Sequence, residues 1–341
     1  MKTITINEIA SNLNISRNTV SKVLNNRGYV STDLKKKIVK EAVENKYKRL
    51  SPEILELYNS ENPPVQKIIS VIATCPEFSD FWTKIISSIA DEVSKTECKL
   101  IYSFLTRTEE SNFELPNIVK AHQASGIIVI NVYNVDAINK ISETGLPIVY
   151  YDSPVFPKTN NNLCGDLILL EGENSIFEIT SKLIERNITP ISFIGDITYS
   201  RTIHERFQGF SSALHANHIA FNEEAYLLSS QILHLYYGEE IDAFLDNLPA
   251  YPKTFICAND FIASVVIRRL KIKGYNVPRD IIVTGYDNTS SQNEETLPSA
   301  TVDVNTQLLG KRLVEQLLWR MEHKSMPYET IHIRTKTIFR F

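Results

Sequence analysis

Metal-binding and nucleotide-binding motifs are missing from this chain. Its four cysteines lie far apart and follow no ligand spacing, and its seven histidines form no H-x-x-x-H or H-E-x-x-H pattern. We therefore predict no metal site, and we expect the cysteines to be reduced and buried as small apolar side chains. Neither G-x-G-x-x-G nor G-x-x-x-x-G-K-S/T occurs, so we expect no dinucleotide or nucleoside triphosphate cofactor.

Long apolar runs are missing as well. The N-terminus has no secretory h-region, and no stretch is long and apolar enough to span a bilayer. We therefore expect a soluble, cytoplasmic protein without a membrane partner. A length of 341 residues predicts two or three domains, and a hydrophobic fraction of 43% is sufficient for a globular core.

Charge is unevenly distributed along the chain. Residues 1–49 hold eleven Lys/Arg and four Asp/Glu, a net charge of +7, whereas the remaining residues hold twenty-five against thirty-six, a net charge of −11. A basic head on an acidic body indicates a nucleic-acid partner for the head. The alternative is a solvated helical surface, because four of these lysines lie within residues 35–40.

The first 25 residues show the pattern of two short helices joined by a tight turn. Asn14 suits a turn position with positive φ, and Ser16 is a good N-cap for the second helix. Apolar residues recur at helical spacing on the facing sides: Ile6, Ile9, Ala10 and Leu13, then Val20, Val23 and Leu24. The outer face of the second helix is polar and consists of Arg17, Asn18, Ser21, Lys22 and Asn25. This is the arrangement of a helix-turn-helix that enters the major groove of DNA.

The chain divides into three parts. A third helix is expected over residues 32–45 with Ser31 as its N-cap, so residues 1–49 form a DNA-binding domain. Residues 50–66 are expected to be a linker with one or two helical turns at 54–57. Residues 67–341 form the body.

In the body, expected strands alternate with expected helices, which implies parallel sheets covered on both faces. We predict strands at 68–74, 99–105, 126–132, 147–151, 191–194, near 225–229, at 254–258 and 281–285, and one final strand at about 330–339. Helices are expected near 81–95, 110–124, 134–144, 173–187, 204–217, 238–247, 260–273 and 306–323. Two doubly wound lobes follow, the first at about 67–164 and 304–325 and the second at about 165–300 and 328–341. Ligands of such lobes bind at the carboxyl ends of the strands.

Several short segments together resemble the LacI/GalR family of bacterial transcription regulators. They are Thr19–Asn25 and Asn45–Tyr47 in the head, and Arg206–Phe210, Cys257–Asp260, Val277–Ile281 and Gly285–Asp287 in the body. Each segment alone is a weak match, but their order and spacing along nearly the whole chain are specific. The resemblance implies a small all-α helix-turn-helix head joined to an α/β body with two periplasmic-binding-protein-like lobes that dimerises and binds an effector.

The resemblance also implies roles for residues of the head. Arg17, Asn18 and Lys22 take the base-reading positions, and their side chains suit guanine and adenine edges. The positions implied to contact phosphates are Ser16, Ser21, Asn25, Tyr29 and Ser31. For Ser16 and Ser31, plain helix capping is the alternative role.

The segment after the head departs from the family pattern. Family hinge helices carry Pro-Asn and then a leucine that wedges into the minor groove, whereas this chain carries Glu53 and Glu56 in a different sequence. Leu55 or Leu57 could supply the wedge after a shift of one residue.

In the body, the family positions that hydrogen-bond an effector correspond to Arg206, Asn259 and Asp287. An arginine, an amide and a carboxylate suit the vicinal hydroxyls of a sugar. The alternatives are a structural ion pair for Arg206 and a turn role for Asp287. In the other lobe, the candidates after the first strand are Thr74, Phe81 and Trp82, of which the two aromatic residues could instead begin a core helix.

These observations predict a repressor that binds a pseudo-palindromic DNA operator as a homodimer. A small molecule, expected to be a carbohydrate, would change its operator affinity. A purine or a protein co-effector is the alternative. A sugar-transport module would not explain the head, and an enzyme would need a catalytic constellation that the sequence does not show, so we predict no catalytic residues.

Overall fold

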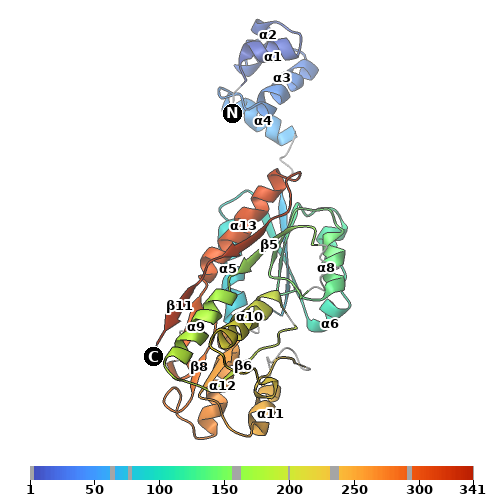
Figure 1. The fold of residues 1–341 in the computed structure, drawn as a ribbon. Helices are drawn as coiled ribbons and strands as arrows, with labels where there is room; N and C mark the ends of the chain where they lie inside the picture. The colour runs from blue at the N-terminus through green and yellow to red at the C-terminus, as the bar shows by residue number, and fades with distance from the viewer. Residues whose placement is uncertain are drawn as a thin grey trace. The chain divides into compact units, whose positions relative to one another are not determined.

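The computed structural model describes residues 4–61, 66–75, 79–155, 163–198, 200–230, 238–289 and 294–340, without the side chains of residue 57 and residues 59–61. It consists of two compact units, Met1–Gln66 and Lys67–Phe341, which we call the head and the body. Figure 1 shows the helices and strands of each unit. None of the helices in the described ranges could cross a membrane.

The head consists of short helices around one apolar cluster. Asn14, in the turn after the first helix, has a φ of 56°, as the sequence predicts. Thr5 and Glu8 form a reciprocal capping box at the first helix, which the sequence reading missed. The cluster includes Ile9, Val20, Leu24, Ile38 and Ala42, all of them buried. The helices are α1 (Ile6–Asn12), α2 (Arg17–Leu24), α3 (Thr32–Glu44) and α4 (Pro52–Glu61).

The two serines predicted to cap helices behave differently. The Ser16 hydroxyl accepts a hydrogen bond from the Thr19 amide at 3.0 Å, which satisfies one free N–H of α2. Ser31 occupies the N-cap position of α3 but makes no side-chain capping bond. The predicted capping role is therefore confirmed for Ser16 and wrong for Ser31.

The helix α4 is longer than the one or two turns expected within the linker. Ile54 is 2% exposed and lies in the apolar cluster of the head, with Leu50 and Tyr58 packed against it. The segment after α3 therefore continues the head core. The side chain of Leu57, one of the two candidate wedge residues, and linker residues 62–65 lie outside the described part.

The body contains two sheets with parallel crossovers. The first has the strand order β10-β5-β4-β3-β1-β2 and is entirely parallel. The second has the order β11-β9-β8-β7-β6, with only β11 antiparallel. The strands are β1 (Ile68–Thr74), β2 (Lys99–Leu105), β3 (Gly126–Ile130), β4 (Ile148–Tyr151), β5 (Asp166–Leu170), β6 (Ile191–Ile194), β7 (Thr254–Cys257), β8 (Ile282–Thr284), β9 (Ala300–Asp303), β10 (Thr330–Ile333) and β11 (Lys336–Phe339).

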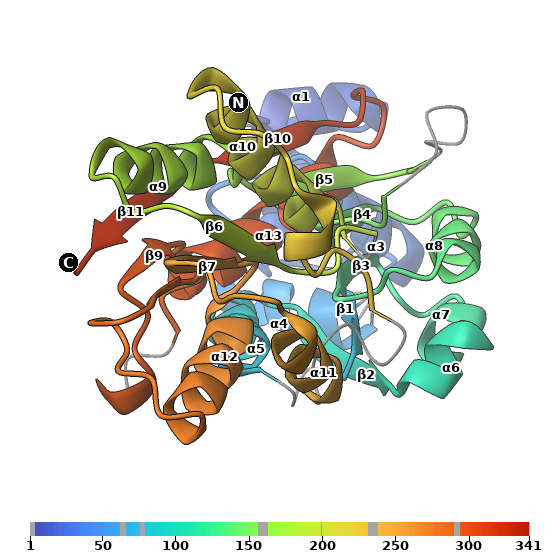
Figure 2. The same cartoon turned by 60° about the horizontal axis from the view of Figure 1, so that its bottom comes forward.

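Helices cover both faces of each sheet, which explains why the central strands are apolar throughout. On β3, Ile127 and Val129 join one apolar cluster while Ile128 and Ile130 join another. Figure 2 shows α6, α7 and α8 grouped at one side of the first sheet. The helices are α5 (Asp80–Val93), α6 (Arg107–Ser111), α7 (Asn117–Lys120), α8 (Val135–Ser142), α9 (Glu173–Glu185), α10 (Arg201–Ala216), α11 (Glu239–Asn247), α12 (Asp260–Ile272) and α13 (Thr306–Glu322), with 3-10 turns η2 (Glu223–Ala225) and η4 (Glu294–Thr296).

The two-lobe, doubly wound fold predicted for the body is confirmed, but several elements differ. The strand β5 was not predicted, and it pairs with β4 in the first sheet although the sequence reading placed residues 165–170 in the second lobe. The expected final strand is two strands, β10 in the first sheet and β11 in the second. The expected helix near 110–124 is two short helices. The segment 225–229 forms a single bridge, Ile194 to Leu227, rather than a strand.

Three segments connect the lobes, namely β5 to α9, β9 to α13 and β10 to β11. Two of them are tied together, because Thr335 donates a hydrogen bond to the backbone carbonyl of Glu171 at 3.1 Å. The Tyr286 hydroxyl donates to the same carbonyl at 2.5 Å. Tyr286 directly precedes Asp287, so this hydrogen bond holds the connection between β5 and α9 close to Asp287.

Candidate DNA-binding face and effector pocket

The outer face of α2 presents the side chains that the sequence predicts to read bases. Arg17, Asn18 and Lys22 are exposed, whereas the opposite face is buried in the head core. No carboxylate among the described residues forms an ion pair with Arg17 or Lys22. The side chains of Arg17 and Lys22 therefore lie on the exposed face of α2 without a carboxylate partner in the described part of the chain.

The residues predicted to contact phosphates surround this face. Tyr29 is 97% exposed and follows α2 in the loop to α3. The Asn25 amide donates to the Ser21 carbonyl at 2.8 Å, which ties that side chain to its own helix. Ser31 is exposed. Ser16 is exposed too, but its hydroxyl caps α2.

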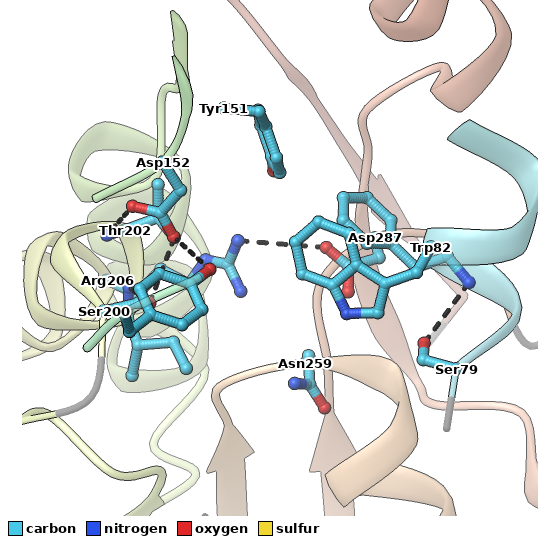
Figure 3. Close-up of a pocket in the computed structure, with 12 residues that line it drawn as sticks. Ser79, Trp82, Tyr151, Asp152, Ser200, Thr202, Arg206, Asn259 and Asp287 are labelled. Atoms are coloured by element: carbon cyan, nitrogen blue, oxygen red, sulfur yellow. Dashed lines mark hydrogen bonds and ion pairs between the residues drawn. The ribbon is translucent and has the colours of Figure 1, made fainter. Parts of the chain in front are cut away.

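A pocket in the body lies where the carboxyl ends of strands from both sheets meet. Figure 3 shows its side chains, which come from α5, the segments after β3 and β4, α10, and the segments after β7 and β8. It is lined by Ser79, Phe81, Trp82, Tyr133, Tyr151, Asp152, Ser200, Thr202, Ile203, Arg206, Asn259 and Asp287. Five of the six predicted effector residues line it, and they converge from segments more than 200 positions apart in the chain.

Arg206 is buried and fixed on three sides. Its Nη1 donates to the Ala258 carbonyl at 2.7 Å, and its guanidinium carbon lies 3.6 Å from the centre of the Tyr286 ring. A side chain at Gly172 would collide with Arg206, since an added Cβ would lie 2.8 Å from the arginine Cγ. The guanidinium is therefore held at the pocket wall before any ligand arrives.

Asp287 faces Arg206, but the two groups do not pair closely. The Arg206 Nη2 lies 3.8 Å from the Asp287 Oδ1, and neither that oxygen nor the Arg206 Nε has a hydrogen-bond partner among the residues that the structure describes. Asp287 has a φ of 103°, which is strained for a residue with a side chain. Burial raises the pKa of the Asp287 carboxyl to about 8, although Arg206 opposes the shift. The pair offers a buried donor and a buried acceptor that the protein leaves unsatisfied.

Asn259 and the aromatic side chains complete the wall. The Asn259 Oδ1 accepts a hydrogen bond from the Ile262 amide at 2.9 Å as the N-cap of α12, so its amide nitrogen remains available as a donor. Phe81 and Trp82 are in edge-to-face contact at 4.9 Å between ring centres. Trp82 also meets Tyr151 edge-to-face at 5.6 Å. Both predicted aromatic residues line the pocket although α5 contains them as buried helix residues.

Thr74 is the predicted effector residue that the structure does not bring to the pocket. It ends β1, is fully buried and is not part of the pocket lining. Its carbonyl accepts a hydrogen bond from the Asn131 amide at 2.5 Å. Its position at a strand end suggested a ligand contact, but the side chain is buried in the fold and does not reach the pocket lining.

Several lining residues were missed by sequence reasoning. Tyr133 and Tyr151 follow and end strands of the first sheet, and Ser200 and Thr202 lie at the N-terminus of α10. The only sequence feature that points to them is a position near the end of an expected strand or the start of an expected helix, and many other residues share that feature. Among the described residues no group of three or more His, Cys, Asp or Glu side chains could hold a metal ion.

Parts of both units match known protein families. Residues 5–49 match the family described as bacterial regulatory proteins, lacI family, and residues 180–340 match the periplasmic binding protein-like domain. A curated relative is the HTH-type transcriptional repressor PurR of Mannheimia succiniciproducens, 27% identical over 342 residues, with 98% of this chain and 97% of the relative covered.

Solved structures agree on the fold. A complex of the transcriptional regulator CelR with cellobiose superposes with a TM-score of 0.66 at 19% identity, covering 98% of each chain. The lac repressor dimer bound to operator and the anti-inducer ONPF superposes with a TM-score of 0.65 at 19% identity, covering 99% of this chain and 98% of that one. The chain therefore combines a lacI-type DNA-binding domain with a periplasmic-binding-protein-like body.

Proposed function

We propose that this chain, which belongs to the LacI family of bacterial regulators, is a sequence-specific DNA-binding repressor controlled by a small molecule. The observation that carries the DNA-binding part is the outer face of α2. Arg17, Asn18 and Lys22 are exposed on it while the inner face is buried. Side chains of these types discriminate base pairs through guanine O6/N7 and adenine N6/N7 in the major groove.

Phosphate contacts would fix the head on the duplex. The exposed Tyr29 and Ser31 flank the base-reading helix, and the basic charge of the head supplies the attraction to the backbone. Because the PurR and lac repressor relatives are a repressor and an operator-bound dimer, we propose that two copies bind a pseudo-palindromic operator.

The proposed effector is a sugar or sugar derivative. Arg206, Asp287 and Asn259 together provide donors and one free acceptor on one wall, which matches neighbouring hydroxyl groups that both donate and accept. Trp82 and Phe81, which come from α5 of the first lobe, provide apolar faces for a sugar ring. A purine remains the second candidate, because PurR is a relative and an aromatic wall also suits a flat base.

Enrichment of random duplexes on the purified chain tests the DNA-binding part. The enriched sequence should be bound more tightly than a shuffled one at the same salt concentration. Arg17→Ala, Asn18→Ala and Lys22→Ala should each weaken binding by about 1–3 kcal/mol at one base position, without change in thermal unfolding. Lys311→Ala, an exposed lysine on α13 of the body, is the control and should leave DNA affinity unchanged.

A thermal-shift screen tests the effector. Ribose, glucose, cellobiose, adenine and guanine are added separately, since a molecule that binds only the native state raises its melting temperature. A sugar hit that also changes operator affinity supports the proposal. If only purines raise the melting temperature, the effector is a purine and not a sugar. A sugar that raises the melting temperature without changing operator affinity would contradict the proposed regulation.

A further inference from the structure

The turn after β8, residues 286–289, carries Asp287 in a conformation that residues with a side chain disfavour. Asp287 has a φ of 103° and Asn288 a φ of 52°, two successive positive values in the absence of a glycine. Such strain costs free energy and persists only where the surrounding structure enforces it. Figure 3 shows the Asp287 carboxylate directed at Arg206. The contacts that hold this turn therefore decide where the carboxylate lies.

Asp260 is a buried carboxylate that contacts the turn without lining the pocket. It is the first residue of α12, directly follows the pocket residue Asn259 and is 1% exposed. Its Oδ2 accepts a hydrogen bond from the Thr289 amide at 3.0 Å. Its own amide donates to the Tyr286 carbonyl at 2.8 Å. The first and the last residue of the turn are thus both bonded to Asp260.

The Thr301 hydroxyl connects the same carboxylate to the middle of the turn. It donates to the Asp260 Oδ1 at 2.7 Å and accepts a hydrogen bond from the Asn288 amide at 3.3 Å. Thr301 is fully buried in β9, and the carbonyl of the next residue, Val302, accepts from the Asp287 amide at 3.0 Å. All four residues of the turn are therefore bonded through their backbone to Asp260 or to β9.

The approach of Asp260 to the turn leaves no room for a side chain between them. An added Cβ at Gly285 would overlap the Asp260 Oδ1 and lie 3.1 Å from the Asp260 Cα. The two carboxylates are also coupled electrostatically. Burial is the main cause of the raised pKa of Asp287, Arg206 opposes it, and the charge of Asp260 adds to the rise.

We propose that Asp260 and Thr301 form a positioning pair for the effector site, which holds the strained turn so that the Asp287 carboxylate points into the pocket. Neither of the two lines the pocket, so the pair acts on a ligand only through Asp287. Their bonds to backbone amides fix φ and ψ of the turn, which a contact to the Asp287 side chain alone would not do. The role in effector binding rests on the proposed function, whereas the placement of Asp287 is measured without ligand.

The test uses the full-length chain without DNA or ligand, and the titration of Asp287 reports where its carboxyl lies. Aspartate is labelled with carbon-13 at the carboxyl carbon, and Asp287→Asn identifies the signal. Thr301→Val removes one hydroxyl and keeps the branched side chain. The pKa of Asp287 should fall from about 8 towards its ordinary value near 4, because a released turn lets the carboxylate reach water. Hydrogen exchange of the Asn288 amide should be faster by about tenfold or more.

Thr284→Val is the matched control. Thr284 ends β8, pairs with the residue before Thr301, and has a buried hydroxyl without a hydrogen-bond partner among the described residues. The same substitution on the neighbouring strand should change neither the titration of Asp287 nor the exchange of Asn288.

A conservative variant separates the charge of Asp260 from its shape. Asp260→Asn keeps an oxygen for the Thr289 amide but removes the negative charge. It should therefore lower the pKa of Asp287 while speeding exchange of the Asn288 amide less than Asp260→Ala does.

Two results would overturn the positioning pair. In the first, Thr301→Val leaves the titration of Asp287 as in the parent, whether or not exchange becomes faster, so that the pair would at most stabilise the turn. In the second, Thr284→Val shifts the titration as far as Thr301→Val does. If Thr301→Val alone shifts it but neither sugars nor purines bind the parent, the proposed effector fails and the placement of Asp287 stands. Because Thr301→Val changes a single hydroxyl, it also decides the question if the Asp260 variants do not fold.

Discussion

Among the described residues of the body there are two buried arginine–aspartate pairs, and they differ in how many of their polar atoms have hydrogen-bond partners. Arg320 and Asp166 meet in two hydrogen bonds, of 2.6 and 3.0 Å, and are 1% and 0% exposed. Arg206 and Asp287 approach only to 3.8 Å, and each keeps a polar atom without a partner. Burial is similar in both pairs, so burial alone does not distinguish a structural pair from a binding site.

The surroundings of the first pair account for every donor and acceptor. Arg320 also donates to the carbonyls of His323, Met326 and Pro327, and Asp166 accepts from Gln316 and from the Glu329 amide. This network fastens α13 and the turn before β10 to β5. At the second pair the protein leaves comparable groups unused, which is costly unless another molecule completes them. This difference supports the proposal that the Arg206–Asp287 pair is part of the effector site.

Breaking the satisfied pair should have the largest effect on stability. Arg320→Met leaves Asp166 charged and buried without its guanidinium, so we expect a loss of about 3–5 kcal/mol in the free energy of unfolding. Urea denaturation of the variant and the parent measures it. Lys311→Ala, which removes an exposed pair with Glu315, is the control and should cost at most about 1 kcal/mol.

A double variant sharpens this result. Asp166→Leu with Arg320→Met removes both charges and should recover part of the loss, because the penalty of the single variant comes from an unpaired buried charge. If the double variant is less stable than Arg320→Met alone, the pair is not what holds α13 to β5, and the contrast drawn above fails.

Asp287→Asn should show the opposite pattern at the unsatisfied pair. Above pH 8, where the Asp287 carboxyl is ionised, removing its charge should leave the ligand-free protein as stable as the parent or more so, because among the described residues Oδ1 has no hydrogen-bond partner. Affinity for the sugar that stabilises the parent best should fall by about 10- to 150-fold, the loss expected when a hydrogen bond to a charged group is removed. Calorimetric titration measures it, and a large loss of ligand-free stability would reassign Asp287 to a structural role.

The raised pKa of Asp287 adds a pH dependence. In the unfolded chain its carboxyl loses its proton near pH 4, whereas burial raises the folded pKa to about 8. Between these values the folded state binds more protons, so this group lowers stability as pH rises through that window. The melting temperature of Asp287→Asn, measured relative to that of the parent, should therefore rise as the pH is raised from 5 to 8. Other titrating groups, including Asp152, are present in both proteins and cancel in the difference, so a constant difference would show that Asp287 is ionised throughout.

How much of this could be predicted from the sequence depends on the range of the contacts. The turn at Asn14, the cap at Ser16 and most helices of the body follow from residues close together in the chain, and they were predicted. The division of residues 330–339 into β10 and β11 was missed, because only pairing with β5 and β9 shows that the segment changes sheets. The strand β5 was missed for a similar reason, since a five-residue apolar run gives no periodic signal.

In the pocket, too, residue identities could be predicted from the sequence, whereas contacts between distant segments could not. Arg206, Asn259 and Asp287 were predicted from the family resemblance, and Phe81 and Trp82 from that resemblance and their position after a strand. All five line the pocket. The resemblance could not show how many hydrogen bonds each carboxylate accepts, because the donors come from both lobes. The Asp152 carboxylate accepts four, two of them from Thr202 in the second lobe, whereas the Asp287 Oδ1 accepts none from the described residues. Thr74 was misplaced because a strand-end position does not say how deep that end lies.

The contrast between satisfied and unused polar groups recurs in the head at a smaller scale. Ser16 caps α2, and Ser16→Ala should therefore cost about 1 kcal/mol of helix stability, seen as faster hydrogen exchange of the Thr19 amide. Ser31 makes no capping bond at α3, so Ser31→Ala should leave exchange in α3 unchanged and weaken DNA binding through a lost phosphate contact. Its affinity should fall by a similar factor for the enriched and the shuffled duplex, since phosphates carry no sequence information. Faster exchange in α3 without a change in DNA affinity would show that the hydroxyl serves the helix and that the contrast does not extend to the head.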